Sequence, residues 1–194
     1  MSVIINASTS SGLTQTADTS GTLELQSNGT TQLTVSSTGA YGQLKSGTAV
    51  ASTSGTSIDF TSIPSWVKRI TIMFNAVSTS GSSSVQIQLG TGSTTYTTSG
   101  YAGSNSYGTT VSSNSAGFIV HANIGAATLA SGIVVLTNVS GNIWAQAGSI
   151  GAASSSVSVS GGSITLAATL TAVRITTAGG TDTFDAGSIN ILYE

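Results

Sequence analysis

Residues 70–75 read Ile-Thr-Ile-Met-Phe-Asn, and residues 85–89 read Val-Gln-Ile-Gln-Leu. In the first stretch Ile, Ile and Phe occupy every second position, and in the second Val, Ile and Leu do so. A period of two is typical of a strand that buries one face. Clusters of Gly, Asn and Ser, which favour turns, separate these stretches from the rest of the chain. The pattern predicts an all-β fold.

Further short apolar runs have the same character, and no convincing helical period occurs. Strands are predicted at 58–60, 118–121, 133–139, 143–147, 157–160, 164–170, 172–177 and 189–193. Strands joined by turns at short intervals favour an antiparallel β-sandwich, here over residues 57–194. Its inner faces are expected to carry Ile70, Ile72, Phe74, Val85, Ile87, Leu89, Phe118, Val120, Ile133, Val135, Ile189 and Ile191.

The first 45 residues are expected to form an arm, joined to the sandwich by a connector at 46–56. Asn28-Gly29 lies between two alternating runs, and this dipeptide is the strongest short signal for a β-hairpin. An isolated hairpin is marginally stable in water, so its apolar face needs a partner. The candidate docking residues of the arm are Val3, Ile4, Ile5, Leu23, Leu25, Leu33 and Val35.

The composition argues against several classes of function. Only 5% of the 194 residues are charged, and no Asp, Glu, Lys or Arg occurs between Arg69 and Arg174. Acid–base chemistry has little to work with, so we expect no enzyme and no cofactor. A net charge of −2 argues against nucleic acid as a partner. The longest apolar run, Ile133 to Leu136, is far below the roughly 18 residues of a membrane span, so no membrane insertion is expected.

Aromatic residues are the best candidates for recognition. Tyr96, Tyr101 and Tyr107 lie on a stretch rich in Gly, Ser, Thr and Asn, a composition typical of adaptable binding loops. We treat them as candidate receptor-binding residues. Trp66 and Trp144 are either platforms for a sugar or, more commonly for tryptophan, core or interface residues.

The remaining candidates for chemistry have simpler explanations. His121 is the only histidine and has no acid nearby in sequence, so a structural role is expected, with ion binding on a three-fold axis as the alternative. Asp182 and Asp185 lie in a Gly-rich turn. Their spacing matches no EF-hand loop, and hydrogen bonding to nearby backbone amides explains them better than calcium.

The scarcity of charge also bears on assembly. Sheet edges are normally protected by lysine, proline or bulges, and this chain has four Lys and Arg residues and one proline. We therefore expect edges and one sheet face to be covered by neighbouring copies.

Two parts of the chain resemble a known group of proteins. INASTSSGLTQTADTSGTLELQSNGTTQLTVSSTG, from residue 5, resembles N-terminal segments of virion proteins of tailed bacteriophages. SIDFTSIPSWVKRITIMFNAVSTSGSSSVQIQLG, from residue 57, and the closing VRITTAGGTDTFDAGSINILYE resemble the opening and closing strands of jelly-roll-like modules of phage fibres, spikes and capsid decoration proteins. The resemblance implies a jelly-roll-like sandwich and a homotrimer on the virion surface.

The length of the chain favours one member of this group over the others. Only about 45 residues precede the sandwich, and no heptad, collagen-like or β-helical repeat could form a shaft. This outline fits a capsid decoration, or cement, protein that binds the major capsid protein or another virion protein. The alternatives are a tail fibre or spike tip that binds a host surface glycan, and a lectin module. No secretory signal is seen, so synthesis in the bacterial host cytoplasm is expected.

Overall fold

The structure, a computed structural model, describes residues 22–36, 39–41, 44–122, 126, 128–152 and 156–194. The chain divides into two compact units, Met1–Leu44 and Lys45–Glu194. Val3, Ile4 and Ile5 lie outside the described residues. Within the described part every regular element is a β-strand.

The first unit contains one three-stranded antiparallel sheet, β1 (Leu23–Ser27), β2 (Thr30–Ser36) and β3 (Gly39–Tyr41), in the order β1-β2-β3. Asn28 and Gly29 form the two-residue turn between β1 and β2, with φ of 51° and 72°. Both angles are positive, as a type I′ turn requires, and Asn and Gly tolerate them best. The predicted hairpin is confirmed.

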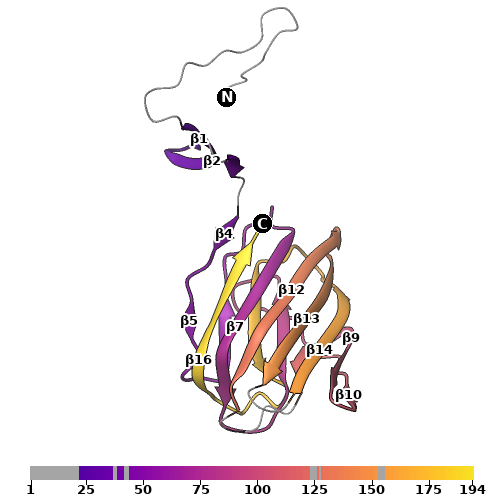
Figure 1. Cartoon of the computed structure of the whole chain (residues 1–194). Helices are drawn as coiled ribbons and strands as arrows, with labels where there is room; N and C mark the ends of the chain where they lie inside the picture. The colour runs from indigo at the N-terminus through magenta and orange to yellow at the C-terminus, as the bar shows by residue number, and fades with distance from the viewer. Residues whose placement is uncertain (1–21, 37–38, 42–43, 123–125, 127, 153–155) are drawn as a thin grey trace, which may run out of the picture. The chain divides into compact units, whose positions relative to one another are not determined.

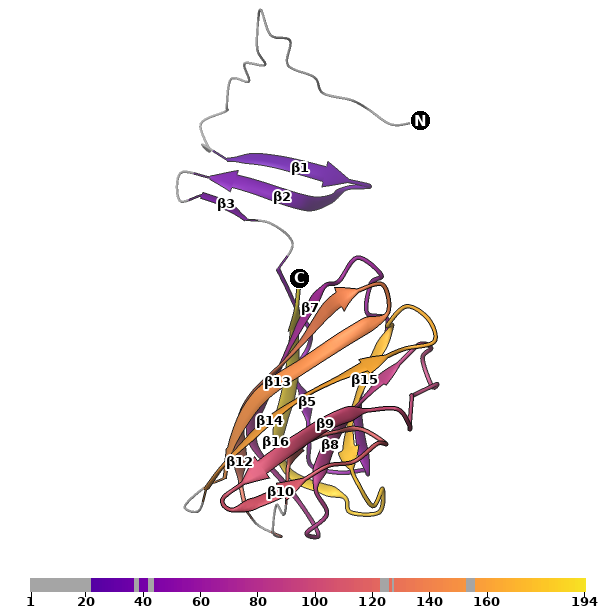
Figure 2. The same ribbon diagram turned by 90° about the vertical axis from the view of Figure 1, so that its right-hand side faces the viewer.

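The second unit is an antiparallel β-sandwich (Figures 1 and 2). Its strands are β4 (Lys45–Ser46), β5 (Val50–Ala51), β6 (Ser57–Phe60), β7 (Arg69–Thr79), β8 (Val85–Gly90), β9 (Ala102–Tyr107), β10 (Thr110–Ser112), β11 (Phe118–His121), β12 (Ala130–Ser140), β13 (Ile143–Ala152), β14 (Ser156–Thr165), β15 (Ala172–Thr177) and β16 (Phe184–Tyr193). A nine-stranded sheet has the order β10-β9-β14-β13-β12-β7-β16-β4, with β5 also on β16. A four-stranded sheet has the order β11-β8-β15-β6. The predicted all-β sandwich is confirmed.

The strand order combines nested strand pairs with a meander. β7 pairs with β16 in the large sheet, and β8 pairs with β15 in the small one, so the opening and closing strands are nested. By contrast, β12, β13 and β14 follow one another as a meander within the large sheet. The strand order establishes a β-sandwich, but it does not establish the predicted jelly roll.

The core lies between the two sheets, and one strand of it is shifted from the prediction. Ten of the twelve expected inner residues are buried, namely Ile70, Ile72, Phe74, Val85, Ile87, Leu89, Phe118, Val120, Ile189 and Ile191. The other two, Ile133 and Val135, point outward, and Val134 and Leu136 are buried instead. The prediction for β12 was wrong because Ile133–Leu136 is apolar at four successive positions, so periodicity cannot distinguish its faces.

The segment predicted as a connector, 46–56, belongs largely to the sandwich. β4 and β5 pair with β16 at one edge of the large sheet, and Gly47 N–H donates to Ile191 O. Ser52 is fully buried, and its hydroxyl donates to Ala186 O at 2.8 Å. The prediction of a connector was wrong because the backbone of this segment completes one edge of the large sheet. Its Ser- and Thr-rich sequence does not reveal this pairing.

Candidate functional site

The first candidate surface is the apolar face of the sheet β1-β2-β3. Leu23 lies opposite Val35 and Leu25 opposite Leu33, so all four share one face. The exposed fractions of Leu23, Leu25 and Val35 are 42%, 42% and 37%, and Leu33 is half-buried. Apolar side chains gathered and exposed in this way are typical of an interaction site.

The opposite face of the same sheet is polar and internally bonded. The side chains of Gln26 and Thr31 each donate to Glu24 Oε2, both at 3.1 Å. The two faces therefore differ sharply in character. The sheet presents one face suited to water and one suited to a partner surface.

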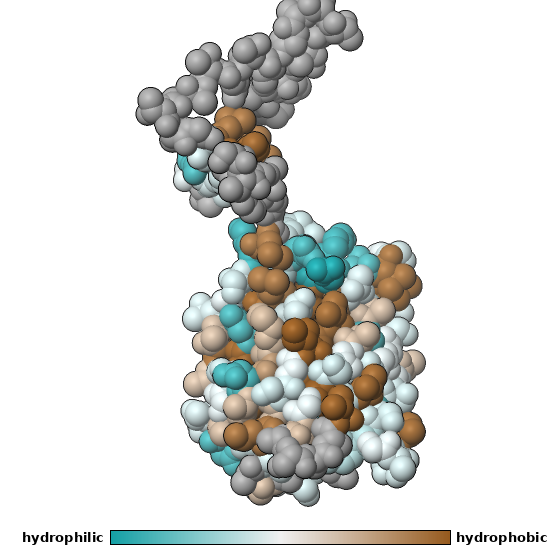
Figure 3. All heavy atoms as spheres, viewed as in Figure 1, coloured by the Kyte–Doolittle hydropathy of each residue, from teal (hydrophilic) through white to brown (hydrophobic). Residues whose placement is uncertain are grey.

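The second candidate surface, here called the outer face, is the side of the large sheet that points away from the core. Its residues include Thr71, Met73, Ile133, Val135, Thr137, Ile143, Ala145, Ala147, Ser149, Val157 and Val159. Ile133, Val157 and Val159 are 52%, 58% and 57% exposed. Figure 3 shows hydrophobic patches among neutral residues across the side of the sandwich turned to the viewer.

The three candidate receptor tyrosines are not brought together on one surface. Tyr101 is 5% exposed, its ring makes an edge contact with Phe118 at 4.8 Å, and its hydroxyl accepts the Leu89 N–H at 2.7 Å. Burial raises the pKa of Tyr101 to about 12, so the phenol stays neutral. The prediction that Tyr101 contacts a receptor was wrong, because its ring lies in the core and its hydroxyl accepts a backbone hydrogen bond from β8.

Tyr107 and Tyr96 are half-buried at different places. The Tyr107 ring packs on His121, with centroids 5.3 Å apart, beside the start of β8. Tyr96 pairs with Gly90 at the end of β8, and the Arg174 guanidinium lies 4.0 Å from its ring centroid. The start and end of this six-residue strand are about 17 Å apart. The sequence could not show that these residues pack against the two ends of one strand.

A polar groove of about 360 Å³ lies beside Tyr96 on the outer side of the small sheet. Gln86 and Gln88 form part of its lining and are 3% and 7% exposed. Gln88 Nε2 donates to Ala116 O at 2.9 Å, and Gln86 Oε1 accepts from Asn114 at 2.9 Å. Both amides are therefore held in fixed positions by the loop after β10.

Arg174 closes one side of this groove. Its guanidinium donates to both carboxylate oxygens of Asp59, at 2.8 and 2.7 Å. This bonding raises the pKa of Arg174, and burial together with the Asp59 carboxylate raises the pKa of Tyr96. Asp59 is therefore the carboxylate that pairs with Arg174. The groove is polar, preorganised and close to neutral.

The acidic pair of the C-terminal turn is occupied by hydrogen bonds. Asp182 accepts the Ser83 N–H at 2.9 Å, and Asp185 accepts from the Ser78 hydroxyl. The partners come from the distant segment around β7 and β8, so these aspartates tie two parts of the chain together. Among the described residues no group of three His, Cys, Asp or Glu side chains is placed to hold a metal ion.

His121 is a buried core residue. It is 1% exposed, and neither ring nitrogen has a hydrogen-bond partner of normal geometry. Burial lowers the pKa of His121, and the nearby backbone of Ala122 opposes this shift without reversing it. The imidazole is therefore held neutral.

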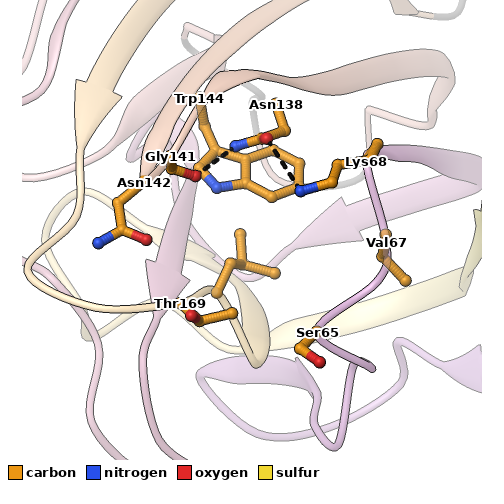
Figure 4. A pocket seen from close by; sticks show the side chains of 9 residues that line it. Ser65, Val67, Lys68, Asn138, Gly141, Asn142, Trp144 and Thr169 are labelled. Carbon is orange, nitrogen blue, oxygen red and sulfur yellow. Dashed lines mark hydrogen bonds between the residues drawn. The ribbon is translucent and has the colours of Figure 1, made fainter.

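The two tryptophans have different surroundings. Trp144 is 4% exposed and borders a small pocket of about 110 Å³ at one end of the sandwich (Figure 4). In this pocket Lys68 Nζ donates to Asn138 Oδ1 at 3.3 Å. Trp66 is 40% exposed and lies 6.0 Å from the Tyr193 ring. Trp144 is a core residue, whereas Trp66 keeps an accessible ring.

Comparisons of the chain with protein-family models, with curated proteins and with solved structures found no match. The described residues also contain no helix with the length and apolar character of a transmembrane span.

Proposed function

We propose that the protein is a structural component of a phage virion, a homotrimer that decorates and stabilises the capsid surface. The observation that carries the proposal is the apolar face of β1-β2-β3, where leucines and a valine remain about 40% exposed. The phage context comes from the resemblance of the N-terminal and sandwich segments to virion proteins. The major capsid protein is the partner best suited to many identical docking events, and the capsid exterior is the location that follows.

The proposal assigns binding, not catalysis, to the protein. Between Arg69 and Arg174 the sequence supplies no charged side chain. Asp182 and Asp185, the acids closest in sequence, already accept hydrogen bonds from Ser83 and Ser78. A glycosidase needs two carboxylates that flank the glycosidic bond it cleaves, and the proposal does not give this role to Asp182 and Asp185.

The test uses two full-length double variants with equal added charge. Leu25→Lys with Val35→Lys places two cations on the apolar face of the arm sheet, and Gln26→Lys with Thr31→Lys places two on the polar face. We expect the first variant to lose capsid binding and the second to retain it, measured by co-sedimentation with undecorated capsids. Full occupancy by the first variant would contradict the docking role of the arm.

A second candidate function is recognition of a host surface glycan by the groove beside Tyr96. Its support is the set of fixed hydrogen-bonding groups, Gln86, Gln88 and Arg174, in one neutral depression. Amide and guanidinium groups suit sugar hydroxyls. A glycan array probed with the full chain and with Gln88→Ala tests it; binding that Gln88→Ala abolishes would favour a fibre or spike tip over a cement protein.

A further inference from the structure

The outer face of the large sheet has a relief that can match a copy of itself. Over the middle of β13 its side chains are small, namely Ala145, Ala147 and Ser149, whereas the larger Ile143 stands at the start of the strand. The neighbouring strands carry larger ones, with Ile133 opposite Ser149 on β12 and Val159 opposite Ser149 on β14. The face therefore has a shallow furrow at Ala147 and Ser149, with aliphatic ridges at Val135 and Ile133 along its β12 side and at Val159 on its β14 side.

We infer that this outer face is the surface through which copies of the chain associate, with the ridge of one copy resting in the furrow of another. The inference rests on the proposed homo-oligomer and names its interface. The ridge and the furrow are different parts of the face, so a contact of ridge with furrow is heterologous and can repeat around a three-fold axis to close a ring of three. Packed sheets lie about 10 Å apart, and small side chains along the furrow allow the ridges to interdigitate at that distance.

The chemistry of the face favours a second copy over other occupants. β9, β12, β13 and β14 contain no Asp, Glu, Lys or Arg, and the only charged residue of β7, Arg69, stands at its first position and is paired with Glu194. Two copies therefore meet with little like-charge repulsion. A strongly charged partner would leave its own charges desolvated and unpaired on this surface. A sugar would find no aromatic ring on the outward positions of β12, β13 and β14.

The size of the face is sufficient for a stable contact. β7, β12, β13, β14 and β9 are adjacent in the sheet, and β12 and β13 have 11 and 10 residues. Four strands of 10 or 11 residues and the six-residue β9, at about 4.8 Å spacing and about 3.3 Å per residue, give a patch of about 750 Å². A standard protein–protein interface buries about 600–1,000 Å² on each partner, so one such face is enough.

The test measures the oligomeric state of full-length protein by sedimentation velocity at micromolar concentration. Ala147→Arg places a cation in the furrow, and Val159→Arg places one on a ridge position that is 57% exposed. Ser54→Arg, on the exposed loop between β5 and β6, is the matched control. We expect the wild type and Ser54→Arg to be oligomers, and the other two to be folded monomers by circular dichroism.

The outcomes separate this inference from the proposed function. If Ala147→Arg fails to fold, Val159→Arg decides, because its side chain points into solvent in the single chain. A folded Val159→Arg variant that keeps the wild-type oligomer overturns the assigned surface and leaves the homotrimer standing. A monomeric wild type overturns both the surface and the homotrimer, while capsid docking by the arm is still judged by the lysine variants.

Discussion

Removing the hydroxyl oxygen of Tyr101 should destabilise the sandwich, because this oxygen hydrogen-bonds to the backbone inside the core. Its hydroxyl accepts the Leu89 N–H at 2.7 Å inside the core. Tyr101→Phe keeps the ring and its edge contact with Phe118 but leaves that buried N–H without an acceptor. A buried donor left unsatisfied costs about 1–3 kcal/mol of unfolding free energy.

In a protein of this size, 1 kcal/mol corresponds to about 2–4 °C in the midpoint of thermal unfolding. The expected fall for Tyr101→Phe is therefore about 2–12 °C. Tyr96→Phe is the matched control, because the Tyr96 hydroxyl is buried and has no hydrogen-bond partner of normal geometry. Its removal breaks no hydrogen bond of that kind and takes away a buried polar group, so it should leave the unfolding free energy unchanged or raise it.

Differential scanning calorimetry of the three proteins at neutral pH measures these shifts. Capsid and glycan binding, assayed well below the unfolding midpoints, should be the same for Tyr101→Phe and the wild type. An unchanged midpoint for Tyr101→Phe, or a larger fall for Tyr96→Phe, would refute the structural role given to the Tyr101 hydroxyl.

Two further predictions concern charge. Because burial lowers the pKa of His121, the unfolded chain takes up a proton at this residue more readily than the folded chain, so the contribution of His121 to the unfolding free energy is fully present above about pH 6.5 and is lost as the pH falls below it. His121→Gln should therefore reduce the difference in unfolding free energy between pH 7.5 and pH 5, measured by urea unfolding. An equal difference in the variant and the wild type would contradict this prediction. Arg174→Met should lower the unfolding free energy by about 1 kcal/mol, since it removes the ion pair with Asp59 and the cation–π contact with Tyr96. This loss should be smaller in about 1 M salt, where charges are screened. A loss that does not depend on salt would argue against a contribution from the ion pair.

The elements that the sequence predicts well are those whose signal is local. The hairpin follows from Asn28-Gly29, because positive φ at two adjacent positions restricts the residues allowed there. β7 and β8 follow from strict alternation over five or six residues. In each case the deciding information lies within the element.

The failures occur where a residue's position depends on distant partners. The inward face of β12 could not be read from Ile133–Leu136, since all four residues are apolar and the neighbouring strands set the register. Tyr101 stands in a loop-like sequence, but its role comes from the backbone of Leu89 on another strand. Gln86 and Gln88 alternate as solvent-facing residues should, yet the loop near Ala116 covers them.

The charged residues of the sandwich lie away from most of the outer face. Arg69 pairs with Glu194 at 2.5 Å where β7 begins and the chain ends, and Arg174 pairs with Asp59 on the outer side of the small sheet. Asp182 lies in the turn before β16. The four strands β9, β12, β13 and β14, which form most of the outer face, carry none. A sheet surface exposed to water would gain solubility and protection against unwanted pairing from even a few lysines, and their absence from these strands is what the proposed association of copies through the outer face predicts.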